Sequence, residues 1–225
     1  MATILVYNLY TNRMERYTRA ETDPMPYSYG RTLLVREFRG SSRSSVMWTT
    51  TTAMESWNIT RRNWGSGIYV GYAYKRIWEG GHGLQSQHYA GTSFDTMQNQ
   101  TSATRRRFHQ LCQSLGVWTY VEPISMTPSW VHFDKRYGSP ACSAGYPLIR
   151  NGSVGVYVLV LQDALNALGY TTRTLDGYFG GNTTNALVAF QRANGLSADG
   201  ICGCNTWRRI TNAVVGIGRT STVID

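Results

Sequence analysis

The pattern of hydrophobic and polar positions divides the chain into a mixed first part and a helical last part. Five segments of the first part are apolar or alternate with a period of two, which predicts β-strands. They are Ile4–Tyr7, Thr32–Phe38, Ile68–Ala73, Val117–Val121 and Trp130–Phe133. Helical spacing appears from Val46 to about Asn63 and over Thr101–Leu115, where Gly116 would end the helix. We therefore expect helices packed on an antiparallel sheet, an α+β fold.

The last part of the chain predicts three short helices. Val158, Leu159, Gln162, Leu165 and Leu168 recur at helical spacing. Before them, residues 137–147 have the Gly, Ser and Pro composition of a linker. We divide the chain into a first domain at residues 1–140, a linker at 141–151, a small all-α domain at 152–213 and a tail at 214–225.

An internal repeat lies within this all-α region. Residues 176–183 and 199–206 share the pattern D-G-x-x-G-x-N-T, 23 residues apart. Asp-Gly is typical of a tight turn, and Asn-Thr can supply side-chain oxygens that cap the next helix. Each copy is therefore expected to lead into a helix.

These features resemble the three-helix peptidoglycan-binding domain of many wall hydrolases, over residues 150–213. The matching positions are Gly152, Gly155, Leu161-Gln162, Leu168-Gly169-Tyr170, Ala189-Phe190-Gln191, Asn194-Gly195-Leu196, Asp199-Gly200 and Thr206-Trp207, with the turn at residues 176–183. The resemblance implies peptidoglycan as a partner and the bacterial cell wall as the place of action. We expect a monomer.

Net charge and hydrophobic content indicate which classes of partner the protein could bind. The net charge is +9, and 42% of residues are hydrophobic, which excludes a disordered chain. A basic surface favours an anionic polymer such as a teichoic-acid-bearing wall, nucleic acid or a membrane, although it can also serve solubility alone. The run Arg105-Arg106-Arg107 is interpreted as the solvated side of an amphipathic helix. We find no nucleic-acid motif, and rank that class last.

No segment predicts a membrane span or a signal peptide. The longest apolar stretch, Val154–Leu161, is far shorter than the roughly 18–20 residues of a span. Residues 1–7 are apolar but short, lack a basic start, and predict a strand instead. We expect either a secreted protein whose signal was removed or a phage lysis protein released without one.

Four cysteines leave two interpretations open. They are Cys112, Cys142, Cys202 and Cys204. No Cys-x-x-Cys pair exists, so a zinc knuckle is not expected. A Cys112–Cys142 disulfide is one possibility in an oxidising setting. Four buried or free thiols is the interpretation that we favour slightly.

Two short motifs carry the candidate chemistry. The first is S-x-H-x-x-G-x-x-x-D, from Ser86 to Asp95, and it includes His88. The second contains His132 and Asp134, which alternation places on one face of a strand. Two histidines and an aspartate can bind Zn²⁺ and leave one position open for water, whose pKa then falls to ~7.

The two motifs resemble the zinc D-alanyl-D-alanine carboxypeptidase and endopeptidase superfamily, from about Trp64 to Gly138. The resemblance implies Zn²⁺ as cofactor, with His88, Asp95 and His132 as its ligands. Many relatives place a catalytic carboxylate three residues before the last ligand, where this chain has Ser129. Asp134, in His-x-Asp, resembles the ending of one branch of the superfamily and is the first candidate to orient or accept a proton, and Glu122 is the second.

The same resemblance suggests where substrate binds. Ser86 belongs to the first motif, and the family's substrate-binding arginine has an approximate match in Lys75 or Arg76. His82 and Trp130 are further cleft candidates, with a loop role and a core role as their respective alternatives. His109 lies in a basic helix and is interpreted as a surface or structural residue.

Three functions are compatible with the sequence. The first is a zinc-dependent wall peptidase of the endolysin or autolysin type that is tethered by its binding module. The second is a non-catalytic peptidoglycan-binding protein that retains the metal site, which the serine at position 129 motivates. The third is a basic nucleic-acid-binding protein.

Overall fold

Two small sheets frame the N-terminal half in the computed structural model, which describes residues 1–218. The first sheet has the order β2-β1-β3, with strands β1 (Ala2–Asn8), β2 (Arg13–Arg19) and β3 (Val46–Thr50). The second has the order β4-β5-β7-β6, with strands β4 (Val70–Tyr72), β5 (Ser93–Thr96), β7 (Val131–Asp134) and β6 (Tyr120–Val121). The second sheet is antiparallel throughout, whereas β3 runs parallel to β1. The α+β class is confirmed, with the correction that the first sheet is mixed.

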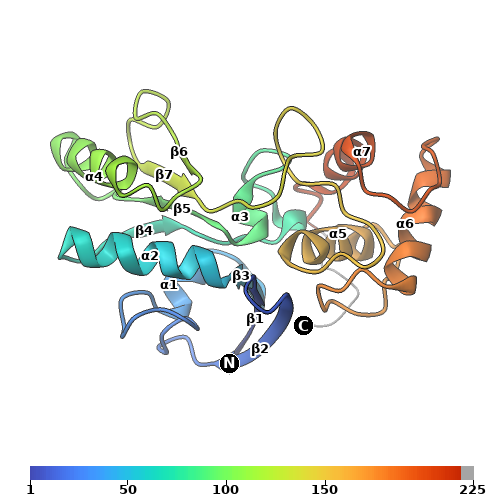
Figure 1. Cartoon of the computed structure of the whole chain (residues 1–225), viewed down its shortest axis with the longest axis horizontal. Coiled ribbons are helices and arrows are strands. Elements are labelled where there is room, and N and C mark those ends of the chain that lie inside the picture. The colour runs from blue at the N-terminus through green and yellow to red at the C-terminus, as the bar shows by residue number, and fades with distance from the viewer. Residues whose placement is uncertain (219–225) are drawn as a thin grey trace.

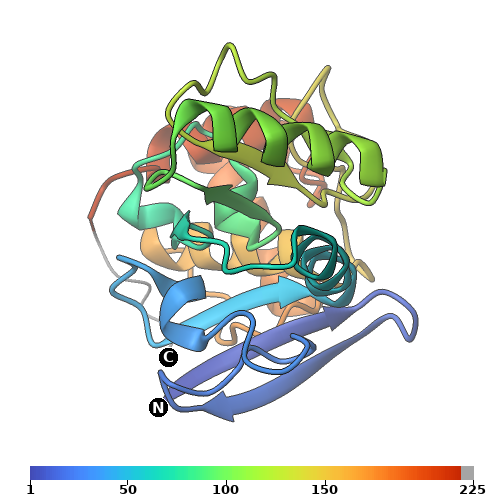
Figure 2. The same cartoon turned by 90° about the vertical axis from the view of Figure 1, so that its left-hand side faces the viewer.

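The helices cover these sheets and build the C-terminal half. They are α1 (Val35–Arg39), α2 (Thr51–Trp64), the 3₁₀ turn η1 (Ile77–Glu79), α3 (Gln87–Ala90), α4 (Ser102–Leu115), α5 (Val156–Ala167), α6 (Gly181–Ala193) and α7 (Cys204–Val214). Helix α4 packs on β7 and β6, and α2 packs on α4 and on the first sheet (Figures 1 and 2). Among residues 1–218, no helix combines the length and the apolar character that a bilayer crossing demands.

One predicted element of the N-terminal half is wrong, and the predicted start of another is wrong. Thr32–Phe38 is not a strand: Val35 and Phe38 are both fully buried three residues apart, which is helical spacing, and Glu37 accepts the Leu34 N–H at 2.7 Å. Val46–Thr50 is a strand and not the start of a helix. Its five residues are all buried, and Thr50 accepts the Ala53 N–H, so that α2 begins only at Thr51.

The repeated turns are each held by a buried glutamine. Gln162 Nε2 donates to Asp176 Oδ1 (2.9 Å) and Thr183 Oγ1 (3.2 Å), and its Oε1 accepts the Gly177 N–H. Gln191, which lies 29 residues after Gln162, makes the same three hydrogen bonds in the second copy. Its partners Asp199, Thr206 and Gly200 each lie 23 residues after their counterparts in the first copy. Both glutamines are at most 1% exposed. The repeat therefore encodes a buried hydrogen-bond network around each turn.

The predicted capping role of the repeat is wrong. The N-cap residues of α6 and α7 are Gly180 and Gly203, and neither helix has a side-chain cap. The threonine shared by the two copies has a different role. Thr183 and Thr206 serve as acceptors for the glutamines, because their hydroxyls lie inside the turn.

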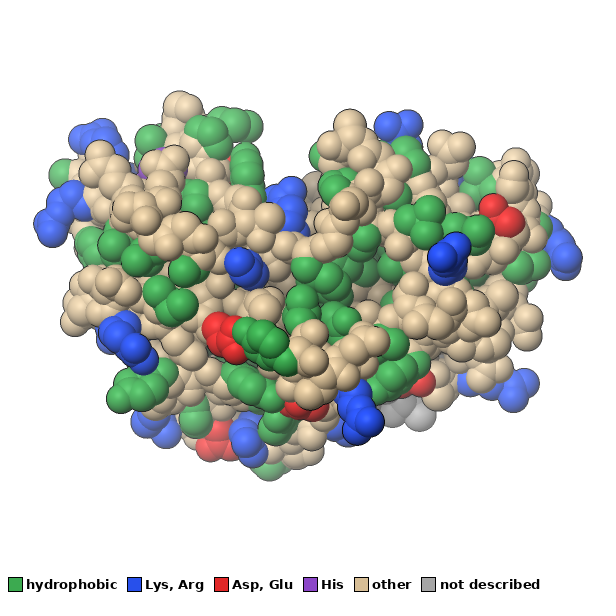
Figure 3. Space-filling model, viewed as in Figure 1, with side chains coloured by type: hydrophobic (Ala, Val, Ile, Leu, Met, Phe, Trp, Pro, Cys, Tyr) green, Lys and Arg blue, Asp and Glu red, His purple; other side chains and the backbone are tan. Residues whose placement is uncertain are grey.

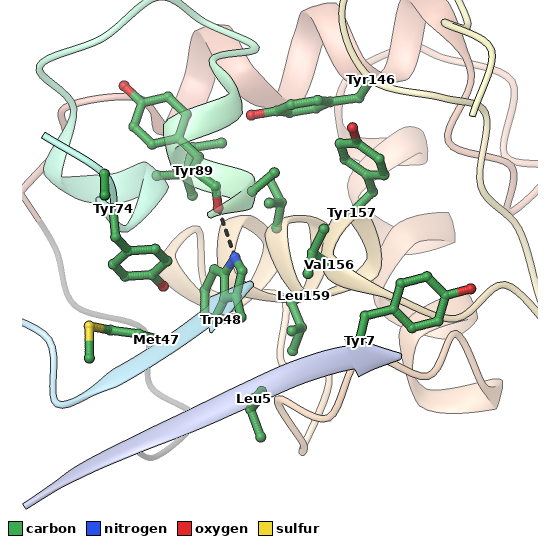
Figure 4. Packing of buried hydrophobic residues seen from close by; sticks show 14 of the residues in the cluster. Leu5, Tyr7, Met47, Trp48, Tyr74, Tyr89, Tyr146, Val156, Tyr157 and Leu159 are labelled. Atoms are coloured by element: carbon green, nitrogen blue, oxygen red, sulfur yellow. Dashed lines mark hydrogen bonds between the residues drawn. The ribbon is translucent and has the colours of Figure 1, made fainter. Parts of the chain in front are cut away.

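Helix α5 joins the two halves into one hydrophobic core. Every residue of α5 is buried. Figure 4 shows Val156 and Leu159 of α5 facing Leu5 and Trp48 of the first sheet, and Trp48 Nε1 donates to the Tyr89 carbonyl at 2.8 Å. The boundaries at residues 141–151 therefore separate sequence regions that share a core.

A buried ion pair fixes α5 in this position. Arg76, at the N-cap of η1, donates from Nε and Nη2 to the two carboxylate oxygens of Asp163, at 2.8 and 2.6 Å. Its Nη1 donates to Ser44 Oγ at 2.7 Å. The side chains of Arg76 and Asp163 are 1% and 0% exposed. The two charges satisfy each other where water does not reach.

The segment predicted as a linker is packed and crosslinked. Tyr146 is buried, and its hydroxyl donates to the Ser86 carbonyl at 2.6 Å. Cys142 forms a disulfide with Cys204, the first residue of α7, with a Cα–Cα distance of 5.0 Å. Both sequence interpretations of the cysteines are therefore wrong, because this segment folds back onto the start of α7.

The other two cysteines are buried thiols. They are Cys112 in α4 and Cys202 before α7, and burial raises the pKa of each thiol. The predicted tail begins within an ordered element, since Val214 is the last residue of α7. Gly218 then donates its N–H to the Trp78 carbonyl at 2.9 Å. The rest of the predicted tail, residues 219–225, lies outside the described residues.

Loss of the crosslink should destabilise the fold. The disulfide spans 62 residues, so the double change Cys142→Ser and Cys204→Ser is expected to lower the free energy of unfolding by about 4 kcal/mol in urea titrations. The pairing itself is tested by alkylating the unfolded, unreduced protein. Only Cys112 and Cys202 should react, and a label on Cys142 or Cys204 would refute the pairing.

Breaking the buried ion pair should also be costly. Asp163→Asn leaves the Arg76 charge buried without a counterion, and we expect a loss of about 3–5 kcal/mol in the same titration. Glu21→Gln is the matched control, because it breaks the half-exposed pair with Arg39 and should cost less than about 1 kcal/mol. Equal losses in the two variants would contradict the structural role of the buried pair.

Candidate metal centre

The first motif places His88 at a sharp reversal of the chain. Ser86 is the N-cap of α3 and its hydroxyl accepts the His88 N–H at 3.3 Å. Gly91 ends the helix in the left-handed region, at φ +66°. A Cβ at that position would lie 1.8 Å from the Trp48 carbonyl oxygen, so only glycine fits. The turn that the sequence predicts between His88 and the strand of Asp95 is therefore present.

The His88 ring is oriented for ligation through Nε2. Its Nδ1 lies 3.2 Å from the Ala73 carbonyl, which makes Nδ1 the donor and leaves the lone pair on Nε2. Nε2 is buried and has no hydrogen-bond partner within the described chain. It faces Asp95 Oδ2 at 3.3 Å. A carbonyl that holds the far nitrogen is the usual support of a metal-binding histidine.

Strand pairing brings the third predicted ligand to the same point. Asp95 on β5 lies directly opposite His132 on β7, and Asp95 Oδ1 is 2.6 Å from His132 Nδ1. Phe94 and Phe133 alternate with them into the core. The carboxylate thus presents one oxygen to each imidazole.

The spacing of the His88 and Asp95 donor atoms fits a zinc ion. Two ligand atoms on a tetrahedral zinc, each at about 2.0–2.1 Å from the metal, lie about 3.3 Å apart, which matches the separation of His88 Nε2 and Asp95 Oδ2. The shorter Asp95–His132 contact is held by a shared proton. Metal binding at Nδ1 requires that proton to leave.

Charge pairing dominates the electrostatics of this cluster. Burial alone would raise the pKa of Asp95, but the hydrogen bond from His132 and the electrostatic influence of the two imidazoles outweigh it and hold that pKa well below its usual range. Burial alone would lower the pKa of His132, whereas Asp134 and Asp95 raise it to about 9. The metal-free cluster therefore pairs an anionic Asp95 with a cationic His132 at neutral pH.

His82 offers an alternative set of donors. Its ring, with those of His88 and Asp95, forms a group whose ligand atoms lie within 4.8 Å of one another. However, the His82 and His88 rings are stacked, with centroids 4.1 Å apart and planes at 23°. In-plane lone pairs of nearly parallel rings do not converge, whereas the His88 and His132 planes meet at 65°. The ring planes therefore favour His132 as the third ligand, whereas the donor-atom distances group His82 with His88 and Asp95.

A pocket of about 540 Å³ opens above these residues. In Figure 3 the upper surface is hollowed between the part of the chain that carries β6 and β7 and the part that carries α7. The lining includes the predicted residues Ser86, His82, Trp130, Glu122, Asp134 and the three ligand candidates. Ala144 and Gly145 of the 141–151 segment form part of its wall. The structure thus brings nearly all sequence candidates together.

Arg76 is the exception. The family's arginine would contact substrate, but Arg76 is 1% exposed and is not among the residues that line the pocket. Its guanidinium is engaged by Asp163. The approximate sequence match to a substrate-binding arginine is therefore corrected, and Arg76 is a structural residue.

Arg136 is a charged pocket residue that the sequence analysis missed. Its Nε donates to Asp134 Oδ1 at 2.7 Å, its Nη2 donates to Oδ2, and its guanidinium carbon lies 4.9 Å from the centre of the Tyr120 ring. The signal for this contact in the sequence is that Arg136 follows Asp134 by two residues. Alternation places side chains two residues apart on the same side of an extended chain.

The two predicted proton-handling carboxylates have different environments. Asp134 is fully buried; burial would raise its pKa, but hydrogen bonds from Arg136 and His132 outweigh it and lower that pKa. Glu122 lines the pocket, and its carboxylate has no hydrogen bond or ion pair within residues 1–218. Its backbone is held by His132 and by His109, whose Nε2 lies 2.9 Å from the Glu122 carbonyl.

The C-terminal helices match a family model and are similar to segments of several named hydrolases. Residues 155–210 match a family model described as a putative peptidoglycan binding domain. The chain is 51% identical over 53 residues to the N-acetylmuramoyl-L-alanine amidase CwlM of Mycobacterium tuberculosis, which covers 24% of this chain and 13% of that protein. It is 45% identical over 78 residues to the amidase CwlL of Bacillus licheniformis, covering 32% and 22%.

Further similar proteins also match only part of this chain. The spore cortex-lytic enzyme of Bacillus cereus is 38% identical over 66 residues, covering 29% of this chain and 26% of that enzyme. A crystal structure of the SleB N-terminal domain is 37% identical over 30% of this chain and 92% of that chain, with a TM-score of 0.29. The chain thus spans only about a quarter or less of these curated hydrolases, and its C-terminal helices carry the signature of a peptidoglycan-binding domain.

Removal of any one donor should abolish tight zinc binding. We expect His88→Ala, Asp95→Ala and His132→Ala each to weaken Zn²⁺ binding by more than about 100-fold, beyond what changes around a metal site usually cost. His82→Ala should retain binding within about 10-fold. Isothermal titration of the metal-free protein measures both. A loss in His82→Ala equal to that in His132→Ala would identify the alternative set.

Proposed function

We propose that this protein is a zinc-dependent peptidoglycan hydrolase that cleaves a peptide bond in the stem peptide or the cross-bridge. One observation carries the proposal. Nε2 of His88 and Nδ1 of His132 each face one carboxylate oxygen of Asp95 in the lining of a pocket, in a chain whose residues 155–210 match a peptidoglycan-binding domain. The names of the similar proteins, amidases and cortex-lytic enzymes, support the same substrate class.

The ligands would hold the metal, and other pocket residues would handle charge and protons. Zinc supplies a Lewis acid that polarises a carbonyl and lowers the pKa of water. Arg136, held in place by Asp134, presents a permanent positive charge to the pocket and would stabilise negative charge on the scissile carbonyl oxygen.

We propose Glu122 as the general base. Its carboxylate lines the pocket and is not committed to another cation. It would take a proton from the attacking water and pass it to the leaving amine. Asp134 is less suited, because Arg136 and His132 occupy its oxygens and keep it anionic. We therefore reverse the order that the sequence suggested and give Asp134 a positioning role.

The helical half would tether the catalytic pocket to its substrate. A tether raises the effective concentration of the polymer near the pocket without new contacts at the cleaved bond. We propose action at the bacterial cell wall, as an endolysin or autolysin of the carboxypeptidase or endopeptidase type. The route to the wall would be secretion or release at lysis.

One observation favours a second candidate, a non-catalytic wall-binding protein. Position 129, three residues before His132, holds an exposed serine that cannot act as a base. In this case the zinc site would have a purely structural role. The two candidates differ only in whether purified walls lose amide bonds.

Substitution of the two carboxylates separates these candidates. We expect Glu122→Gln to lower the rate of amine release from purified peptidoglycan by about 10²- to 10⁴-fold, the usual contribution of a general base, without a change in zinc affinity. His132→Ala should be inactive. Glu55→Gln, an exposed carboxylate bonded to Tyr10, is the matched control and should keep full activity.

Two results would change the proposal. Full activity in Glu122→Gln together with inactivity in Asp134→Asn would return the base role to Asp134. Retention of the zinc-loaded protein on walls without any amine release, across wall types and pH, would establish the binding protein instead.

A further inference from the structure

The two copies of the repeated turn differ in what covers them. The first copy lies against β2 of the N-terminal half: the Met14 N–H donates to the Tyr178 hydroxyl at 3.1 Å. A Cβ at Gly177 would lie 2.9 Å from Met14 Sδ. The equivalent of Tyr178 in the second copy is Ile201. The N-terminal half therefore occupies the surface of the first turn.

The second copy leaves the corresponding surface open as a pocket of about 400 Å³. Its lining includes the apolar residues Leu148, Leu196 and Ile201 together with Asp199 and Asn205. Leu148 is 51% exposed, although it is a large apolar side chain. Identical internal networks hold both turns, so the difference lies in their surroundings and not in their fold.

The polar groups at this pocket are available to a ligand. Asp199 Oδ1 is used inside the turn by Gln191 and by the Ile201 N–H, while its Oδ2 has no partner within the described chain. The Asn205 amide is exposed and likewise makes no hydrogen bond to residues 1–218. The pocket thus offers both donors and acceptors beside exposed aliphatic carbon.

This combination suits a saccharide better than a stem peptide. Sugar rings present apolar C–H faces bordered by hydroxyl and acetamido groups, which match an aliphatic surface with an amide and a carboxylate at its edge. Asp199 is the charged residue among those that line the pocket, and its negative charge disfavours the carboxylates of a peptide.

The pocket also adjoins the candidate metal centre. Cys204 lines it and is bonded to Cys142, with 5.0 Å between their Cα atoms. Ala144 lines the metal pocket and is two residues from Cys142, which is at most about 8 Å along the chain. One crosslinked turn therefore separates the two pockets.

We propose that the pocket beside the second turn binds the glycan strand of peptidoglycan, and that the Cys142–Cys204 turn sets the reach from this strand to the metal centre. The inference rests on the proposed function, which it extends by assigning the polymer's two chemical parts to two pockets. The glycan occupies the hollow at α7, and the peptide that branches from it extends past Ala144 to His88, Asp95 and His132.

The repeat supplies a matched pair of variants for the test. Asn205 and Asn182 are equivalent exposed residues, each second in its helix, but only Asn205 lines the pocket. The probe is glycan oligomers from which the stem peptides have been removed, titrated into the full-length protein by NMR or calorimetry. Asn205→Ala should weaken binding by about 3- to 10-fold, the loss of one hydrogen bond, and Asn182→Ala should leave it unchanged.

A second variant tests whether weaker glycan binding could result from a loss of stability. Leu148→Ala removes exposed aliphatic surface without touching the glutamine networks, and should also weaken glycan binding while the unfolding midpoint stays constant. Equal affinities for Asn205→Ala and Asn182→Ala would overturn the proposal. So would binding of a free stem peptide, but not of the glycan, at the residues of this pocket.

The test is independent of catalysis. Binding is measured again in His132→Ala, where hydrolysis is absent. A glycan response that depends on Asn205 in that background supports the site even if the protein proves to be a binding protein. If the protein hydrolyses walls but Asn205→Ala does not change glycan affinity, this pocket is rejected as the glycan site. The hydrolase proposal then still stands.

Discussion

The bidentate ion pair between Arg76 and Asp163 is the constraint on which the arrangement of the two halves depends. Both charges are out of reach of water, so neither can be separated from the other without a large desolvation cost. Arg76 begins η1, just before the loop of His82, and Asp163 lies in the middle of α5. The pair therefore fixes the C-terminal helices relative to the loops that build the metal pocket, where a flexible linker would leave them free.

This fixed arrangement makes the segment between the halves part of the site. Gln85 Oε1 accepts the Tyr146 N–H at 2.9 Å, and a Cβ at Gly145 would lie 2.2 Å from the same oxygen. Gly145 therefore lets the segment approach the loop before His88 and close one side of the pocket. The disulfide at Cys142 holds the other end of this turn against α7. The wall-binding helices and the metal pocket would then act on one polymer at a fixed distance from each other. A mobile linker between them would not fix that distance.

Local sequence signals predicted the parts of the site that depend on short-range geometry. The left-handed glycine after His88 and the alternation around His132 are consequences of backbone sterics, and the structure has both. The role of Arg76 could not be predicted, because its partner lies 87 residues away and neither residue has a local signature. The same applies to the disulfide, since cysteine spacing does not determine pairing. Val46–Thr50 was misassigned because a short, fully buried run has no period that separates strand from helix.

Digestion in heavy-oxygen water shows whether the protein hydrolyses a peptide bond of the wall. Purified peptidoglycan is incubated with the zinc-loaded protein, and the released fragments are analysed by mass spectrometry. We predict new free amines matched by heavy oxygen in the new peptide carboxyl groups, because water supplies that oxygen atom. Heavy oxygen at a sugar's reducing end, or no incorporation above the His132→Ala background, would contradict it.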